Sequence, residues 1–328
     1  MRLPLNILEE TALVAGGVDS LAAAMDECSE DERSEMHRLD DLGLPPVTSL
    51  PAISVMTGYS PGFIRSLLQQ KSRHYREFSI PKGRSRRTIE APRVGLKFVQ
   101  KWLAWHFAKV WEPHESAHGF VSGRSHISAA SVHLGARWVV SVDIKDFFPS
   151  TSEEIVRNAL VRLDYNSEES LEILCGLCCF RQRLPQGAPT SPVLSNIAIH
   201  PIDEEIANLA ATYGCRYTRY ADDIVLSGKH TMPSDVVQEL EQTFLSKPWS
   251  LSDRKKEVSR LPNRLKVHGL LVHGERLRLT KGYRNRIRAY RHMSENNKIS
   301  DHDTNRIMGH LEYSKQVDRF NSRSQSKP

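Results

Sequence analysis

The chain has 328 residues, of which 39% are hydrophobic and 26% charged, and this composition excludes both a membrane-embedded and a disordered polypeptide. No run approaches the roughly 18 consecutive apolar residues of a bilayer-spanning helix, and the opening MRLPLNILEE turns acidic too early for a secretory leader. The five cysteines are odd in number and partly clustered, which argues against a disulfide framework. We therefore expect a cytoplasmic protein that does not enter a membrane.

Charge is unevenly distributed along the chain, whose formal net charge is +6. Residues 1–44 carry three basic and eleven acidic side chains, whereas residues 251–328 carry nineteen basic and eight acidic ones. A basic C-terminal region is typical of a nucleic-acid partner, although a solvated helical surface would give the same count. The acidic start is expected to pack on the basic body or on another protein.

The first third of the chain reads as short helices around one basic hairpin. Ser20 is a candidate N-cap for a helix from Leu21 towards Leu39, and Ser60-Pro61 is a typical helix start. The segment Ile80–Ile89 (IPKGRSRRTI) predicts two strands joined by a basic turn. A buried helix face follows, because apolar residues recur at spacings of three and four: Leu96, Val99, Leu103, Phe107 and Val110.

From residue 136 to 250 strands and helices alternate. We expect strands at 138–142, 216–220 and 224–227, and helices at 153–163 and from Ser167 to about Phe180. The cysteines at 175, 178 and 179 lie in that last helix beside leucines, which favours core packing over half of a zinc site. Beyond 251 the pattern predicts a strand pair (267–272 and 276–279), a basic helix at 281–293 and a frayed tail from 321.

Three aspartates stand at the ends of apolar strands. Asp143 ends VVSVD, and Asp222 and Asp223 lie at the tip of RYTRYADDIVLS. Carboxylates that converge repel one another unless a cation lies between them, and such hard oxygen ligands suit Mg²⁺. Two such ions, about 3.5–4 Å apart, can clamp both oxygens of a displacement at phosphorus. An isolated YADD is also compatible with a plain polar hairpin turn.

The YADD motif is not isolated, because Asp143 opens DIKDFFPS and LPQGAPTSP lies between the two carboxylate sites. In this order the motifs resemble the palm of a reverse transcriptase. More closely the chain resembles a bacterial retron reverse transcriptase, through IPKGRSRRTIEAP, Gly119-Phe120, Gly123-Arg124-Ser125, LPQGAPTSPVLSN and TRYADD over about residues 45–293.

The resemblance implies an α+β right-hand polymerase fold behind an acidic helical extension. The implied boundaries are an extension at 1–44, fingers at 45–135, palm at 136–250, thumb at 251–320 and a tail at 321–328.

The resemblance also implies residue roles. Asp143, Asp222 and Asp223 would form the catalytic triad and hold two Mg²⁺ ions together with the main-chain carbonyl of Ile144. Phe148 would be the gate against a ribose 2′-hydroxyl, with the alternative that Phe147 and Phe148 are both core residues. The nucleotide would be contacted by Lys82, Arg87, Phe148 and Gln186.

Two motifs of the retron group are altered. The family's Asn-Ala-x-x-His element reads Ala129-Ala130-Ser131-Val132-His133 here, and its Val-Thr-Gly reads Val267-His268-Gly269. Residues expected to contact RNA by this resemblance are His133, Lys255, His268, Arg284 and Arg288.

The expected function is therefore an RNA-directed DNA polymerase that copies part of its structured non-coding RNA into a branched RNA–DNA hybrid (msDNA). Family membership implies priming from an RNA 2′-hydroxyl, dNTP substrates, an effector protein from the same operon and a role in phage defence. The chain length leaves no room for an RNase H domain, so a host RNase H would remove the template.

Three alternatives stay open at this point. The first is another bacterial reverse transcriptase of the abortive-infection or intron type. The second is a ribonucleoprotein scaffold that restrains an effector, and the third is an RNA-dependent RNA polymerase, which Phe148 disfavours.

Overall fold

The computed structural model describes residues 9–83, 85–296 and 298–325, which fall into two compact units. The first unit comprises residues 1–114 and 146–201, and the second comprises 115–145 and 202–328. Residues of the expected fingers (45–135) and of the expected palm (136–250) occur in both units, and the boundaries of these functional subdomains stay a prediction. No helix in the described ranges combines the length and the apolar character that a bilayer crossing needs.

The acidic N-terminal region forms two helices where the sequence predicted one. Helix α2 (Gly17–Ala23) ends before Ser29, whose side chain accepts a hydrogen bond from the Glu32 N–H and caps α3 (Glu30–Asp41). The prediction of a single helix from Leu21 to Leu39 is wrong, because a Ser cap followed by acidic residues starts a new helix. Leu21 and Leu39 are fully buried, so this region packs through its apolar face.

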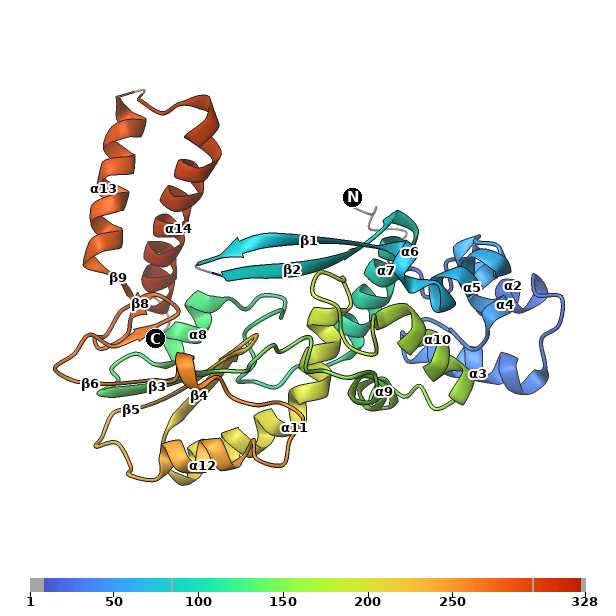
Figure 1. The fold of residues 1–328 in the computed structure, drawn as a ribbon, viewed down its shortest axis with the longest axis horizontal. Helices are drawn as coiled ribbons and strands as arrows, with labels where there is room; N and C mark the ends of the chain where they lie inside the picture. Colours follow the sequence, from blue (N-terminus) through green and yellow to red (C-terminus); the bar gives the residue numbers. More distant parts are fainter. Residues whose placement is uncertain (1–8, 84, 297, 326–328) are drawn as a thin grey trace. The chain divides into compact units, whose positions relative to one another are not determined.

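The rest of the first unit consists of helices around a long hairpin (Figure 1). The helices are α4 (Leu50–Thr57), α5 (Pro61–Gln69), α6 (Lys71–His74), α7 (Val94–Val110), α9 (Glu153–Val161), α10 (Glu168–Cys178) and the first part of α11 (Ser191–Thr212). The predicted Ser60 cap is confirmed by its hydrogen bond from the Phe63 N–H. Cys175 and Cys178 are buried, unpaired thiols, as the packing interpretation expected.

The predicted basic hairpin is confirmed and is longer than the sequence suggested. Strand β1 (Tyr75–Lys82) pairs antiparallel with β2 (Ser85–Pro92), from Tyr75 opposite Pro92 to Lys82 opposite Ser85. Strand β2 leads directly into α7, whose Leu96, Val99, Leu103 and Phe107 are buried as predicted. The prediction for Val110 is wrong, because this last residue of the helix is exposed.

A four-stranded antiparallel sheet forms the centre of the second unit. Its strands are β3 (Trp138–Asp143), β4 (Arg216–Tyr220), β5 (Asp223–Gly228) and β6 (Glu257–Arg260), in the order β4-β5-β3-β6. On one face, the fully buried Arg219 forms an ion pair of 2.6 Å with Asp203 of α11. Each charge of this buried pair is neutralised by the other, so the part of α11 that begins at Ile202 is tied to β4 within the second unit.

The opposite face of the sheet shares one apolar core with α8 (His126–Val132) and the C-terminal elements. These elements are β7 (Lys266–Val267), β8 (Leu270–Leu271), β9 (Arg278–Leu279), α13 (Lys281–Glu295) and α14 (Asp301–Gln325). The remaining elements are α12 (Val236–Gln242) and the short 3₁₀ helix η1 (Asp253–Lys255). Ile287 of α13 is buried in this core, with Tyr283 and Tyr290 packed against it, as the helical spacing predicted.

The predicted tail is helical for most of its length, which corrects the expectation of fraying from residue 321. Helix α14 continues to Gln325, while residues 326–328 lie outside the described residues. The Asn321 side chain accepts a hydrogen bond from the Leu277 N–H and donates one to the Leu277 carbonyl. This tertiary anchor holds the last turns, which local composition alone would leave frayed.

Candidate active site

The three aspartates converge at one end of the central sheet. Asp143 lies directly opposite Asp223 in the β3–β5 register, and the Ile144 N–H donates to the Asp222 carbonyl over 2.8 Å. The Asp143 carbonyl in turn accepts from the Ser252 N–H over 2.8 Å. Main-chain hydrogen bonds therefore fix the positions of all three residues, independently of their side chains.

The carboxylates form a concentrated negative site. Asp143 is only 5% exposed, and the pKa of Asp222 is raised by burial and by the neighbouring charge of Asp143. Lys255 Nζ pairs with Asp143 Oδ2 and supplies one compensating charge. Lys255 was expected to contact RNA, but the structure places its ammonium group on the carboxylate of Asp143.

This donor set fits a divalent cation chemically, since hard carboxylate oxygens of neighbouring residues meet where Lys255 supplies one compensating charge for three carboxylates. Ile144 is fully buried and forms an isolated bridge with Leu251, so its main chain is also held at this point. Among the described residues, no three His, Cys, Asp or Glu side chains have the arrangement of a formed metal site. The structure therefore brings the three aspartates together but gives no coordination geometry for a metal ion.

His268 packs against the β4–β5 hairpin, beside Tyr220 and Asp223, although the sequence suggested that it contacts RNA. Its side chain is 8% exposed, its Nδ1 lies 3.9 Å from Asp223 Oδ2, and its ring centroid lies 5.3 Å from that of Tyr220. Burial lowers its pKa to about 4, so the ring is neutral at pH 7. A buried, neutral ring offers little to an RNA phosphate, and the expectation of RNA contact is therefore corrected.

His133 is likewise inside the protein and has no exposed surface. Its Nδ1 lies 2.7 Å from Ser227 Oγ and its Nε2 lies 2.8 Å from Thr218 Oγ1. Burial lowers its pKa to about 3, so the neutral ring links the neighbouring strands β5 and β4. The expectation that His133 contacts RNA is replaced by this structural role.

The residues expected at the nucleotide belong to the first unit. Phe147 is 5% exposed and Phe148 is partly exposed, so one of the two adjacent rings is a core residue and the other reaches the surface. Arg87 lies in β2 opposite Ile80 and is partly exposed. Lys82 ends β1, and its side chain lies outside the described set.

The loop that carries Gln186 is held by a dense set of hydrogen bonds. The Glu90 N–H donates to the Gln186 carbonyl over 2.8 Å, and the Gln186 N–H donates to Glu90 Oε2 over 3.3 Å. On either side, Ser191 Oγ donates to the Pro185 carbonyl and the Leu184 N–H donates to the Thr151 carbonyl. The Gln186 carboxamide has no partner among the described residues and is free to bind a ligand.

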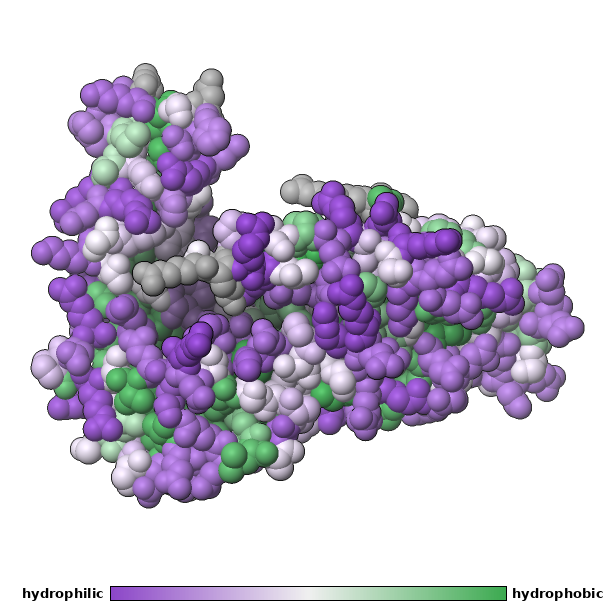
Figure 2. Space-filling view, viewed as in Figure 1, coloured by the Kyte–Doolittle hydropathy of each residue, from purple (hydrophilic) through white to green (hydrophobic). Residues whose placement is uncertain are grey.

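The C-terminal elements carry an arginine cluster around a cavity of about 340 Å³. The cluster consists of Arg276, Arg278, Arg284, Arg288 and Arg291, which we call the thumb arginine cluster. None of its members forms an ion pair with a residue in the described part of the chain, and Asp318 is the acidic residue that lines the same cavity. The outer surface of α13 and α14 is predominantly hydrophilic (Figure 2).

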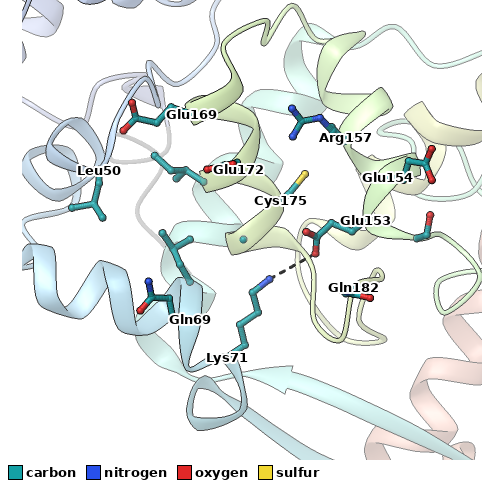
Figure 3. A pocket seen from close by; sticks show the side chains of 14 residues that line it. Leu50, Gln69, Lys71, Glu153, Glu154, Arg157, Glu169, Glu172, Cys175 and Gln182 are labelled. Atoms are coloured by element: carbon teal, nitrogen blue, oxygen red, sulfur yellow. Dashed lines mark ion pairs between the residues drawn. The ribbon is translucent and has the colours of Figure 1, made fainter.

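A second cavity, of about 820 Å³, lies in the first unit. Its charged lining is mainly acidic and consists of Glu153, Glu154, Glu169 and Glu172 with Lys71 and Arg157. Lys71 points toward Glu153, with 3.8 Å between Nζ and Oε2 (Figure 3). None of the site residues expected from the sequence lines this cavity.

Comparisons with known proteins agree with the geometry of the aspartates. The family described as reverse transcriptase (RNA-dependent DNA polymerase) matches residues 80–273, which include all three aspartates and the Gln186 loop. The chain is 31% identical to the retron Ec86 reverse transcriptase of Escherichia coli over 78% of this chain and 81% of that protein. It is 30% identical to the retron Mx65 reverse transcriptase of Myxococcus xanthus over 84% of this chain and 70% of that protein.

The chain belongs to the retron reverse transcriptases. This retron reverse transcriptase is an RNA-directed DNA polymerase with the right-hand polymerase fold that the sequence motifs predicted. The thumb arginine cluster follows the matched range, since its first member is residue 276.

Sequence reasoning missed two residues that organise the retron reverse transcriptase site. The buried carboxylate of Glu90 forms an ion pair with the partly exposed Arg183 and supports the Gln186 loop. The available signal was a lone acidic residue, Glu90, directly after a strongly basic hairpin. Its partner lies 93 positions away, and no local pattern connects the two.

Proposed function

We propose that this enzyme copies part of a structured non-coding RNA into a branched RNA–DNA hybrid, msDNA, starting from an RNA 2′-hydroxyl. The observation that carries the proposal is the convergence of Asp143, Asp222 and Asp223 in a chain related to retron enzymes over most of its length. Retron relatives of this similarity favour a dedicated RNA over a generic template.

In this proposal the chain's own residues bind and orient the reactants. Asp143, Asp222, Asp223 and the Ile144 carbonyl would hold two Mg²⁺ ions, since strand register and main-chain hydrogen bonds bring these residues together. When bound, these ions activate the primer hydroxyl and neutralise charge on the pyrophosphate leaving group. The protein itself acts by positioning, since no covalent intermediate is needed.

The first unit would bind the incoming dNTP. Gln186 offers a free carboxamide, and Arg87 and Lys82 lie on a basic hairpin suited to triphosphate oxygens. Phe148, whose ring reaches the surface, would exclude a ribose 2′-hydroxyl.

The thumb arginine cluster supports RNA as the partner of the second unit. Within the described residues no carboxylate pairs with these five guanidinium groups, which repel one another, and a polyanion relieves that repulsion. Guanidinium groups also match phosphate geometry through paired hydrogen bonds. Arg284 and Arg288, which were expected to contact RNA, belong to this cluster.

The proposed product, partners and location of the enzyme rest on the same similarity to retron reverse transcriptases. The msDNA product and its RNA would stay bound, a host RNase H would remove the copied template, and an effector protein of the same operon would act in phage defence. We place the enzyme in the cytoplasm, where these partners and dNTPs are found.

The test is to purify the protein from its native locus and to sequence the nucleic acid that accompanies it. We expect a short DNA joined to RNA through a 2′–5′ linkage, absent when the protein carries Asp222→Asn. Recovery of bulk ribosomal or messenger RNA without such a branch would overturn the proposal.

A second measurement separates this function from RNA-dependent RNA synthesis. Phe148→Ala should raise ribonucleotide incorporation about tenfold or more relative to dNTPs, because the ring that excludes the 2′-hydroxyl is removed. The buried neighbour Phe147 is not a suitable control, since its removal would open the core. An unchanged ratio of ribonucleotide to deoxynucleotide incorporation would show that Phe148 is not the gate.

A further inference from the structure

Glu90 is a carboxylate buried in the first unit, at the inner end of the fingers hairpin. Its side chain is 3% exposed and receives two hydrogen bonds from Arg183, 2.8 Å from Nη2 to Oε1 and 2.9 Å from Nη1 to Oε2. Burying a charge in this way costs desolvation free energy that an apolar pair of similar volume would avoid. The pair is therefore not explained by stability alone.

The same carboxylate also holds the main chain of the nucleotide loop. Glu90 Oε2 accepts from the Gln186 N–H over 3.3 Å, and the Glu90 N–H donates to the Gln186 carbonyl over 2.8 Å. Gln186 is thus fixed at both its N–H and its C=O by one residue of β2. Its carboxamide stays unpartnered among the described residues and can bind a ligand.

The loop and β2 approach too closely for a side chain to lie between them. Gly187 has a φ of +130°, and a Cβ at this position would lie 3.0 Å from Ile89 Cγ2 and 3.1 Å from the Glu90 carbonyl oxygen. The main chains of the loop and of β2 are therefore in direct contact at this point. The Glu90 side chain, paired with Arg183, adds a further hydrogen bond to the loop.

A neighbouring ion pair on the same two segments provides a natural comparison. Arg181 donates two hydrogen bonds to Glu77 of β1, at 2.8 and 3.1 Å, and its Nη1 also lies 3.5 Å from Glu90 Oε1. The Arg181 and Glu77 side chains are 55% and 40% exposed. Glu77 has no hydrogen bond to the Gln186 main chain. Exposed pairs of this kind contribute little to stability.

We propose that Glu90, locked by Arg183, is a positioning residue that orients Gln186 for the incoming dNTP. The inference rests on the proposed role of Gln186 in nucleotide binding. Glu90 touches neither the substrate nor the aspartates in this role, and it acts through the Gln186 main chain.

The test measures the KM for dNTP and kcat separately on a generic RNA template with a DNA primer. Glu90→Gln should raise the KM about tenfold and change kcat less than threefold, because it loosens a ground-state contact. The matched control Glu77→Gln removes the exposed carboxylate and should leave both values within twofold of the wild type.

A double-mutant cycle separates positioning from general structure. Gln186→Ala alone should raise the KM, and adding Glu90→Gln should raise it no further, since the contact that Glu90 positions is already gone. If Glu90→Gln lowers the melting temperature strongly, the variant Glu90→Gln/Arg183→Gln removes both charges and should show the same tenfold rise in KM.

The outcomes are distinguishable. A KM unchanged in both Glu90 variants while Gln186→Ala raises it would overturn the positioning role and leave the role of Gln186 standing. Fully additive effects of Glu90→Gln and Gln186→Ala would also overturn it. A Gln186→Ala enzyme with a normal KM would instead overturn the proposed nucleotide contact itself.

Discussion

The three aspartates and the Gln186 loop are held by different sets of contacts. Asp143 and Asp223 face each other through strand register, and Asp222 is fixed by the Ile144 N–H, so backbone hydrogen bonds place all three. The Gln186 loop also has main-chain hydrogen bonds, but in addition it depends on the side chains of Glu90, Arg183 and Ser191. Substitution of an aspartate should therefore lower the reaction rate and leave the backbone in place. Substitution of a residue that supports the loop should instead displace Gln186.

The largest expected effect is at the aspartates. Asp222→Asn should lower single-nucleotide extension by about 10³-fold or more, since it removes an anionic oxygen ligand that would hold the Mg²⁺ ions of the proposed mechanism. The melting temperature should not fall, because the raised pKa of Asp222 shows that its charge is disfavoured in the fold. A loss of activity accompanied by unfolding would contradict placement by the backbone.

A smaller effect is expected at the histidine inside the sheet. The folded pKa of His133 is about 3, below the ordinary value of 6.5, so between these values the unfolded state binds more protons. Its contribution to stability is complete above pH 6.5 and is lost as the pH falls, by about 2 kcal/mol at pH 5.

Chemical denaturation at pH 7.5, 6 and 5 checks this dependence. His133→Gln should show a shallower loss of unfolding free energy with falling pH than the wild type. Part of the slope should remain, because burial also lowers the pKa of His118 and His268 to about 4. Equal slopes for the two proteins would mean that His133 does not link the strands as a neutral ring.

The smallest effect is expected at the loop. Gly187→Ala places a Cβ against β2 and should raise the KM for dNTP about tenfold, or about 1.4 kcal/mol, with little change in kcat. Gly269→Ala is a matched control for backbone strain, since its φ is +83° but no atom lies within 4 Å of the added Cβ. If Gly269→Ala raised the KM equally, backbone strain rather than the approach to β2 would explain the effect.

The sequence by itself determined the features that depend on neighbouring residues. Apolar strands that end in Asp143 and at the Asp222–Asp223 tip predicted where the carboxylates lie. The sequence also predicted the Ser60 cap and the basic hairpin. These features follow from local rules: strand alternation, helix capping and turn chemistry. For the same reason the family motifs could be recognised before the fold was known.

Only the tertiary structure decided the features that depend on distant partners. A histidine in a motif looks equally able to bind RNA or to fill a core, and burial alone showed that His133 and His268 do the latter. Glu90 and Gln186 are 96 residues apart, and no periodicity in either segment indicates their contact. Local patterns specify which element forms, whereas the partner of a buried polar side chain is chosen by packing, because only packing removes the competing water.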